Sequence, residues 1–502
     1  MAETTGSARG EAAAGGSGAG RTSGQTAAAL RKTYEEIMSR APEHSPQPSL
    51  ERMAYVLDLL GHPEQSFKVV QVTGTNGKGS TSRLAEALIR AYGLRTGLYT
   101  SPHLEKVTER IAIDGQDISD ERFVETYDEV KDLIALTDEH SLANGGERMS
   151  FFEVLTTMAI WAFADAPIDV AVMEVGMGGR WDATNVLDAA AAIIGPVDKD
   201  HMQWLGDTVE KIAAEKAGII KPGSTVIVGP QKKKSVEDII AAKARGTEGT
   251  VLLRDGEELK VVSRMPAVGG QVATLRTPNG EYQEVPIKMF GEHQAHNALA
   301  ALAACETVLP VNGALDGGLV AEAFGTVRIP GRIEVIRHSP TIILDGAHNP
   351  HAAEHLVDAI NENFAFKELV GVVSMMADKQ VETVLGDLEP LLSKIVVTQN
   401  SHTSRVMPAE DLAKIARDVF GEDRVYVEPL MPNALQKAVD LVDAGDETGL
   451  GYGYGVLVTG SFVTVGDART LLKPRQNRDL LKPKAERALS DDGEANAAHT
   501  EC

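Results

Sequence analysis

The sequence predicts an α/β protein of two domains: a P-loop-type domain with a mainly parallel sheet and a small β insertion, followed by a second, Rossmann-like α/β domain. Three observations predict this class. Short apolar runs alternate with segments of helical periodicity over most of the chain, which is typical of βαβ units. A glycine-rich loop that contains a lysine, Val72–Thr81, joins one such run to a helical segment. Residues 250–290 instead alternate in short runs around Thr277-Pro-Asn-Gly280, which indicates an antiparallel meander or hairpin.

The expected elements follow in order along the chain. The expected strands of the first domain are 67–72, 96–100, 168–175, 190–194 and 225–228. A helical run from Glu292 to Leu309 precedes Thr326–Arg332, whose proline and glycine mark the domain junction. The expected strands of the second domain are 341–344, 370–374, 395–398, 425–428 and 456–459. We therefore expect a disordered extension over 1–27, domains over 28–328 and 329–475, and a disordered tail over 476–502.

Composition excludes several classes of protein. At 502 residues the chain is too long for one ordinary core. The formal net charge of −23 argues against a nucleic-acid partner, because binding to a phosphate backbone needs clustered Lys and Arg. The two cysteines, Cys305 in an apolar segment and the terminal Cys502, make a disulfide framework improbable, and a reducing compartment fits. No apolar run reaches bilayer length and the first residues lack a signal-peptide core, so we expect a cytoplasmic protein with no membrane partner, compatible with a monomer.

The glycine-rich loop is typical of nucleotide-phosphate binding. Gly74, Gly77 and Gly79 allow backbone amides to approach phosphate oxygens, Lys78 adds a positive charge, and a helix that begins near Ser80 points its positive end at them. The loop departs from the usual G-x-x-x-x-G-K-[ST] pattern, since Gly79 separates Lys78 from Ser80. The alternative is a glycine-rich turn that binds no ligand.

Two further polar residues follow expected strands, where open α/β sheets bind ligands. Glu174 ends the apolar strand and precedes the glycine-rich turn Gly176–Arg180, so its carboxylate is placed to hold Mg²⁺ on nucleotide phosphates. The alternative is a carboxylate that faces water. His201 follows another strand and a proline-containing loop, 195–200, and by itself fits a structural role equally well.

Lys216 falls on the inward face of an expected helix. Asp207–Glu210 resembles a capping box that begins this helix, and Gly218 is a plausible stop. The lysine shares its face with three apolar residues, Val209, Ile212 and Ala213. Lys211 and Glu215 are expected to pair on another face. Burying a lysine is costly unless it is paired or its charge changes, although snorkelling at the helix end would explain the pattern as well.

Eight sequence motifs occur in an order that resembles the folylpolyglutamate synthase family, including its bifunctional dihydrofolate synthase members, within the Mur ligase superfamily. The resemblance spans roughly residues 45–470. The motifs are Val72–Ser80, Tyr99–Leu104, Glu174–Asn185, Glu215–Ile219, His296–Ala301, Pro330–Arg332, Leu344–Pro350 and Thr459–Phe462. The family carries the same shortened phosphate loop with a glycine after the lysine.

The resemblance implies a role for each of four sets of residues. The implied ATP contacts are Thr75, Asn76, Gly77, Lys78, Gly79, Ser80, Asn297, Arg332 and Asp345. The implied ligands of two Mg²⁺ ions are Ser101, Glu174, His201 and, if it is carbamylated, Lys216. The implied folate or pteroate contacts are Ser150, Phe151, Phe152, Glu153, Trp181, Asp182 and Ala183, with tryptophan where the family usually has leucine. The implied glutamate contacts are His348 and Ser461.

The resemblance implies an ATP-dependent acid–amino-acid ligase with ATP in the cleft between the domains. A carboxylate of dihydropteroate or a reduced folate would attack the γ-phosphate, and L-glutamate would then attack the acyl phosphate. Lys78, Lys216 and His201 would be the catalytic residues, with no side-chain nucleophile, and closure of the domains would assemble the site. The alternatives are a muramyl-peptide ligase and a catalytically silent nucleotide-binding regulator.

Overall fold

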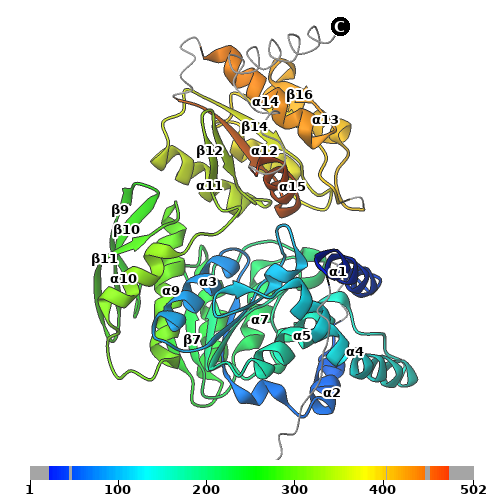
Figure 1. The fold of residues 1–502 in the computed structure, drawn as a ribbon. Coiled ribbons are helices and arrows are strands. Elements are labelled where there is room, and N and C mark those ends of the chain that lie inside the picture. The colour runs from blue at the N-terminus through cyan, green and yellow to red at the C-terminus, as the bar shows by residue number, and fades with distance from the viewer. Residues whose placement is uncertain (1–21, 44–47, 403, 447–452, 474–502) are drawn as a thin grey trace, which may run out of the picture.

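The structure is a computed structural model that describes residues 22–43, 48–402, 404–446 and 453–473 of the chain. It has two α/β lobes that face each other, the first domain below and the second above in Figure 1. The tail expected over 476–502 and residues 1–21 of the expected extension lie outside the described residues. Within the described residues no helix is both long enough and apolar enough to span a bilayer.

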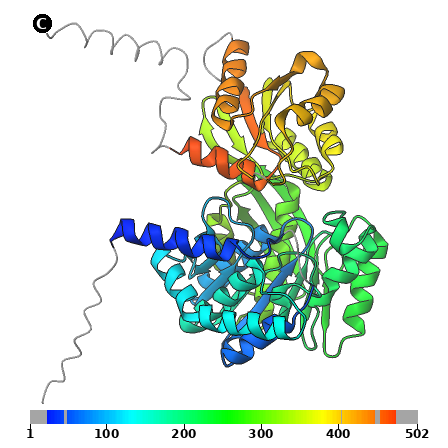
Figure 2. The same cartoon turned by 90° about the vertical axis from the view of Figure 1, so that its right-hand side faces the viewer.

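The expected disorder of residues 23–27 is wrong, because helix α1 (Ser23–Met38) begins there. Its start is stabilised by Thr22, whose hydroxyl accepts a hydrogen bond from the backbone of Gln25 at 3.4 Å, while the Gln25 side chain accepts one from the Thr22 amide at 2.9 Å. The helix packs on α4 (Asp120–Ala143) and α5 (Phe151–Asp165) and buries Ile37. Figures 1 and 2 both place α1 on the side of the first domain that faces the second.

The large sheet of the first domain contains eight strands among the described residues, in the order β4-β3-β2-β5-β1-β6-β7-β8. Their bounds are β1 Lys68–Thr73, β2 Thr96–Tyr99, β3 Ile111–Ile113, β4 Gln116–Asp117, β5 Val170–Glu174, β6 Ala191–Ile194, β7 Thr225–Val228 and β8 Val251–Arg254. All pairs are parallel except those of β3 and β4. The five strands expected here are confirmed to within two residues. Val251–Arg254, expected in the antiparallel region, instead extends the large sheet beside β7.

Helices cover both faces of this sheet, because successive strand residues point to opposite sides. On one face α3 (Lys78–Ala91) and α9 (Glu292–Val308) pack on alternate residues of β1, β5 and β6. On the other, α2 (Glu51–Leu59) and α5 cover the β2 side, and α7 (Val209–Lys216) and α8 (Lys234–Arg245) cover the β7 side. The shorter helices are α6 (Met202–Leu205), η1 (Pro63–Ser66), η2 (Val107–Arg110), η3 (Ala183–Val186) and η4 (Ala217–Ile219). The expected parallel α/β architecture is confirmed.

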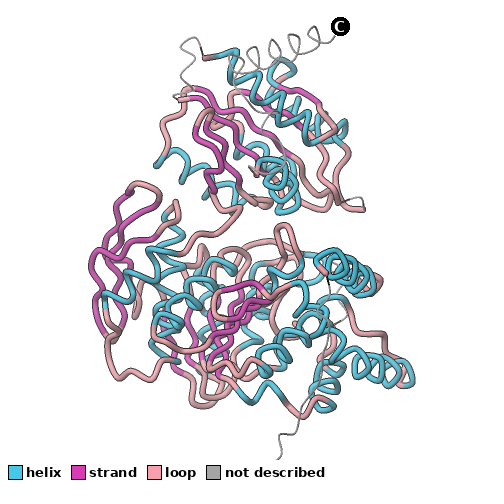
Figure 3. Tube along the Cα trace, viewed as in Figure 1, coloured by secondary structure: helices cyan, strands magenta, loops and turns pink. Residues whose placement is uncertain are grey.

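The small β insertion is an antiparallel sheet of β9 (Lys260–Ala267), β10 (Gly270–Thr277) and β11 (Gly280–Ile287). Thr277 pairs with Gly280 across the turn that the Pro-Asn-Gly sequence predicts. This sheet packs on α9 and α10 (Gly317–Thr326), and Figure 3 shows it standing out from the first domain.

The second domain has a sheet in the order β12-β13-β17-β14-β15-β16 within its described part, parallel except for β12. Its strands are β12 Glu334–His338, β13 Thr341–Leu344, β14 Glu368–Val373, β15 Lys394–Val397, β16 Val425–Val427 and β17 Tyr454–Thr459. Its helices are α11 Pro350–Asn363, α12 Val381–Leu388, α13 Ala409–Phe420, α14 Met431–Gly445, α15 Phe462–Leu472 and the short η5 Glu422–Arg424. One face packs on α11, α12 and α13 and the other on α14 and α15, as in a Rossmann-like domain.

Candidate active site

A cavity of about 950 Å³ lies between the two domains, lined by residues of both. From the first domain it receives the phosphate loop, the turn after β5 and the start of α5. From the second it receives loops that follow β13, β14, β15 and β17. Because the carboxyl ends of parallel strands lie at one edge of a sheet, both domains present this edge to the same space. Most of the site residues expected from the sequence therefore meet in one place.

The phosphate loop joins β1 to α3, which begins at Lys78, two residues earlier than expected. Gly77 precedes it with φ of 81°, a conformation that favours glycine, and a side chain there would also meet Asn297 Oδ1 at 2.6 Å. Lys78 Nζ donates to the carbonyl oxygens of Gly74 at 3.1 Å and Thr75 at 3.3 Å. An ammonium has three donors, so one is left for a phosphate oxygen. Burial lowers the pKa of Lys78, and nearby Glu174 partly offsets this.

Glu174 lies buried at the end of β5, beside the loop. Its Oε2 accepts a hydrogen bond from the Ser101 amide at 3.1 Å, and a Cβ on Gly79 would lie 3.4 Å from the same oxygen. Burial raises the pKa of this carboxyl, while Lys78 opposes the rise. Ser101 and His201 line the same cavity. Burial lowers the pKa of His201 to about 3, so its ring is neutral at neutral pH, as a metal ligand requires.

The expected metal ligands fit Mg²⁺ and do not form a complete cage. No group of three or more His, Cys, Asp or Glu side chains in the described ranges is arranged to hold a metal ion. Of the four expected ligands, only Glu174 and His201 belong to these types. Mg²⁺ is usually held by one or two carboxylates together with waters and substrate phosphates, so this sparse set beside a phosphate loop suits it.

Lys216 is confirmed on the inward face of α7 and is only 3% exposed. Its Nζ donates to the Gly74 carbonyl at 2.8 Å. Burial, reinforced by the positive charge of Lys78, lowers its pKa to about 7. A substantial fraction of this amine is therefore neutral near pH 7, which is the form that reacts with CO₂.

Two details of this helix differ from expectation. The hydroxyl of Thr208, not the carboxylate of Asp207, caps it by accepting from the Lys211 amide at 3.3 Å. The Lys211 ammonium is then free to pair with Asp207 at 2.8 Å, while Glu215 faces Arg180 at 3.6 Å. The expected pair of Lys211 and Glu215 is wrong because these nearer partners compete for both charges.

The residues expected to contact the folate line one wall of the cavity. Ser150 and Glu153 form the capping box of α5, and Glu153 is also paired with buried Arg52 at 3.0 Å. The Asp182 carboxylate accepts from the Thr184 hydroxyl at 2.6 Å and from the Met177 amide at 2.9 Å. These carboxylates hold the turns in shape. The rings of the wall, Phe151, Phe152 and Trp181, supply flat apolar surface.

In the second domain His348 and Ser461 both reach the cavity. The Nδ1 of His348 donates to the Gly346 carbonyl at 2.9 Å, leaving Nε2 3.6 Å from Asp200. The Ser461 hydroxyl accepts from the Thr464 amide at 3.0 Å and so caps α15.

Among the second-domain side chains that line this space, Lys379, His402 and Arg405 were not assigned from the sequence. Lys379 follows β14 and pairs with Asp200 at 2.6 Å, and Arg405 follows β15 and pairs with Asp378 at 2.8 Å. Their position after consecutive strands of the second sheet was the signal that could have found them.

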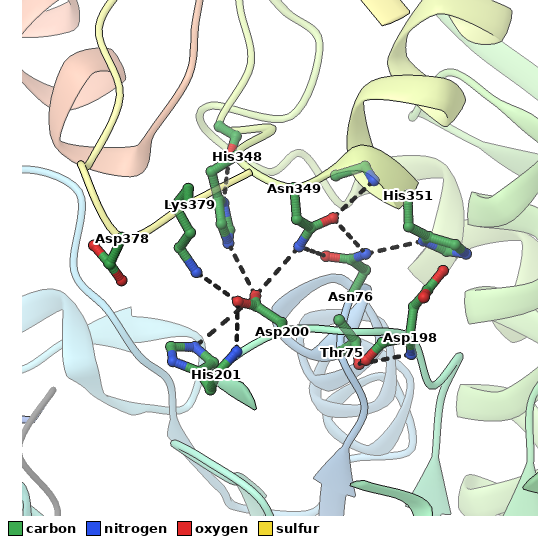
Figure 4. Close-up of polar contacts among 12 residues, drawn as sticks. Thr75, Asn76, Asp198, Asp200, His201, His348, Asn349, His351, Asp378 and Lys379 are labelled. Carbon is green, nitrogen blue, oxygen red and sulfur yellow. Dashed lines mark hydrogen bonds and ion pairs between the residues drawn. The ribbon is translucent and has the colours of Figure 1, made fainter. Parts of the chain in front are cut away.

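Two polar bridges join the domains at the edge of the phosphate loop (Figure 4). Asn76 and Asn349 exchange side-chain hydrogen bonds of 3.2 and 3.1 Å, and Asn76 also contacts His351 at 2.9 Å. Asp200, next to His201, accepts from Lys379 at 2.6 Å and from Asn349 at 3.3 Å. The phosphate loop and the second domain are therefore in direct contact.

Three of the expected ATP residues do not line the large cavity. Asn297 lines a second cavity of about 420 Å³, together with four histidines, His293, His296, His351 and His355. Ser80 is buried in the first turn of α3. The Asp345 carboxylate accepts from the amides of Ile333 at 2.9 Å and Ala347 at 2.8 Å, and its charge faces Arg332. Asp345 thus supports Arg332, which does line the large cavity.

Comparison with known proteins defines the class. Residues 72–305 match the Mur ligase middle domain, and residues 331–462 match the Mur ligase, glutamate ligase domain. Together with the two facing α/β domains and the phosphate loop in their cleft, these matches make the protein a Mur-type ligase.

Comparison with individual relatives identifies the family within the class of Mur-type ligases. The dihydrofolate synthase/folylpolyglutamate synthase of Mycobacterium tuberculosis is 44% identical over 460 residues, covering 88% of this chain and 94% of that one. The dihydrofolate synthase/folylpolyglutamate synthase of Bacillus subtilis is 30% identical over 436 residues, covering 85% of this chain and 95% of that one. The chain belongs to the folylpolyglutamate synthase/dihydrofolate synthase family, and the resemblance found in the sequence is confirmed.

Solved structures agree. The M. tuberculosis folylpolyglutamate synthase complexed with ADP has a TM-score of 0.85 at 42% identity, covering 90% of this chain and 100% of that one. E. coli FolC in complex with DHPP and ADP has a TM-score of 0.72 at 28% identity, covering 89% of this chain and 97% of that one.

Proposed function

We propose that this protein joins L-glutamate to a carboxylate of dihydropteroate or of a reduced folate, using ATP. The observation that carries the proposal is the single cavity in which a phosphate loop, a buried carboxylate, an aromatic wall and cationic groups of a second domain meet. The relatives named above for both activities and the relative complexed with ADP support it. The aromatic wall suits the flat rings of a folate, and the phosphate loop suits the phosphates of ATP. The cationic groups suit the carboxylates of glutamate.

The first step is phosphoryl transfer. A carboxylate oxygen of the acceptor forms a bond to the γ-phosphorus, the bond from that phosphorus to the bridging oxygen breaks, and ADP leaves. Both reactants are anionic, so their mutual repulsion opposes the approach of the carboxylate to the γ-phosphate. Lys78, the amino end of α3 and Arg332 supply positive charge around the loop, and they are fixed before the reaction begins. Asn297, with the second cavity, would take the part of ATP beyond the phosphates.

Mg²⁺ would be held by Glu174, His201 and Ser101, with Lys216 as a further ligand once carbamylated. When bound, the ion neutralises phosphate charge. The buried Glu174 carboxyl fits this role, since desolvation disfavours its charge unless a cation is close.

The second step is aminolysis. The glutamate nitrogen attacks the acyl carbon, phosphate leaves with the electron pair of the broken bond, and the nitrogen loses a proton to give the amide. His348 and Ser461, with Lys379 and Arg405 beside them, would hold the carboxylates of glutamate. Water must be excluded, because a hydrolysed acyl phosphate wastes ATP. The interdomain bridges at Asn76 and Asp200 support domain closure as the means. We also propose that the enzyme works as a monomer in the cytoplasm.

The test is ADP release by the purified full chain with ATP and Mg²⁺, with and without L-glutamate, on dihydropteroate and tetrahydrofolate separately. We expect glutamate-dependent ADP release and products one glutamyl unit heavier by mass spectrometry. Extension of both acceptors establishes a bifunctional enzyme, and extension of one assigns the activity. ADP release without any glutamylated product would overturn the proposal and favour a nucleotide-binding regulator.

A further inference from the structure

The proposed function assigns no task to the small β insertion, yet this insertion contacts the second domain. Two side chains of this region reach across, Arg264 on β9 and Phe290, which follows β11. The ring of Phe290 lies 5.1 Å from the ring of Phe364, between centroids and at an angle of 54°. Phe290 packs against the hydrophobic core of the second domain, although β11 and α9 flank it in the chain. An aromatic side chain next to the insertion therefore extends the core of the other domain.

Arg264 makes a second contact with the same region. Its Nη1 and Nη2 donate to the two carboxylate oxygens of Glu362, in the last turn of α11, at 2.9 and 2.8 Å. A bidentate pair fixes the relative orientation of its two groups as well as their distance. The two side chains are 19% and 30% exposed, and the more exposed carboxylate of Glu292 lies 3.7 Å from the same Nη2. The pair joins the sheet of the insertion to the carboxyl end of α11.

The insertion is in turn held on the first domain. Its sheet packs on α9 and α10. Gln271 on β10 is only 3% exposed, and its Nε2 donates to the carbonyl oxygens of Met289 at 3.1 Å and Gly291 at 2.7 Å. Gly291 has φ of 92°, and a Cβ at this position would lie 3.0 Å from the Cβ of Ala359 on α11. The backbone between β11 and α9 is therefore fixed, and it lies close to α11.

The first domain thus holds α11 at both ends. The helix has 14 residues, so it is about 20 Å long. At its amino end the capping residue Asn349 exchanges hydrogen bonds with Asn76 of the phosphate loop (Figure 4), and His348, one residue earlier, lines the large cavity. At its carboxyl end lie Glu362 and Phe364, the partners of the insertion. Because a helix is stiff along its axis, a tilt that is allowed at one end displaces the other.

We propose that Arg264 and Phe290 are positioning residues of the ligase, which act through α11 to fix His348 and Asn349 against the phosphate loop. The β insertion is the support that carries them. The inference rests on the proposed function, in which His348 holds the glutamate that attacks the acyl phosphate. When the carboxyl end of α11 is released, the bound glutamate is less well aligned with the acyl carbon, and water competes more successfully for it.

The experiment measures the ADP released per glutamylated product by the full chain, at a glutamate concentration below the KM. Hydrolysis of the acyl phosphate gives ADP without product, so the excess of ADP over product reports the alignment of glutamate. We expect this excess to rise about threefold or more in Arg264→Gln and in Glu362→Gln, since each breaks a partly exposed ion pair. A loss of folded enzyme would lower ADP and product equally and leave their ratio unchanged. Phe290→Ala should raise the excess as well.

The double variant Arg264→Gln/Glu362→Gln tests whether the two residues act through each other. It should show the same excess as either single variant, because the pair is already broken in both. Both residues also border the second cavity, so a direct contact of Arg264 with ATP is the alternative. Effects of the two substitutions that add, together with a KM for ATP that rises in Arg264→Gln alone, would establish that alternative and overturn the inference.

The control is Arg276→Gln, whose guanidinium pairs with Glu281 at 2.7 Å between two strands of the insertion. It should keep the wild-type ratio. If Arg264→Gln forms no product at all, the result with Glu362→Gln decides. A wild-type ratio in Glu362→Gln would overturn the inference while the ligase stands. A wild type that releases ADP without glutamylated product would instead overturn the proposed function on which the inference rests.

Discussion

Lys216 should carry a carbamate, and the structure sets the size of the effect. Burial beside Lys78 lowers its pKa from 10.5 to about 7. At pH 7 roughly half of this amine is neutral, against roughly 0.03% for a lysine that keeps the ordinary value, so the reactive fraction is roughly a thousandfold larger. The carbamate nitrogen keeps an N–H for the 2.8 Å bond to the Gly74 carbonyl, so the modification does not require that contact to break.

The assay is ¹³C NMR of the full chain equilibrated with ¹³CO₂ at constant pressure. We expect a carbamate resonance at pH 8 that is absent from Lys216→Ala and retained in Lys211→Ala, whose lysine is exposed and paired with Asp207. The folded-state pKa is lowered, so the neutral amine is favoured as pH rises. Its fraction falls from about nine-tenths at pH 8 to about one-tenth at pH 6, and the resonance should fall at least in proportion.

Turnover should follow the modification, because the neutral or cationic lysine cannot act as a carboxylate ligand. We expect Lys216→Ala to lower kcat about a hundredfold or more. A resonance of full intensity in Lys216→Ala would refute the reasoning. So would a wild type that incorporates no label yet turns over at full rate.

Three further substitutions test the loop, the metal ligand and the second domain. Gly77→Ala should raise the KM for ATP about tenfold or more, because the new methyl group meets Asn297 and the backbone has φ of 81°. The control is Gly93→Ala, where φ is 79° and the space around the residue is open. This control should lower the stability of the protein by about 1–2 kcal/mol and leave the KM for ATP unchanged. Glu174→Gln should raise the Mg²⁺ concentration for half-maximal rate about tenfold or more, and an unchanged Mg²⁺ titration would remove Glu174 from the metal site. Lys379→Ala should raise the KM for glutamate about tenfold without altering the KM for the acceptor, and equal changes in both would count against the assignment.

The local parts of this protein could be predicted because their chemistry lies in contiguous residues. The phosphate loop needs glycines, a lysine and a following helix, all within Val72–Thr81. The strands that end at Glu174 and Val228 are apolar runs of ordinary strand length, and the expected bounds are within two residues of the observed ones. The inward face of Lys216 follows from the helical period alone.

Other features failed to be predicted because they depend on competition between neighbours. The start of α1 at Ser23 lies in a stretch of disorder-prone composition, and a capping box together with burial of Ile37 outweighs that composition. The sequence of Val251–Arg254 predicts part of a hairpin, yet this segment pairs with β7, a strand more than twenty residues earlier in the chain. The strand propensity of a short segment predicts its partner poorly, because the tertiary context decides which strand it pairs with.

The sequence by itself determined the class of protein, the two-domain α/β plan and the phosphate loop that lines the cavity, since motif order and hydrophobic period are properties of the chain. Only the tertiary structure decided which distant segments share the cavity. Lys379 and Arg405 reach the cavity beside His348 and Ser461 through the parallel order of the second sheet. Such meetings arise from contacts between segments that no local pattern encodes.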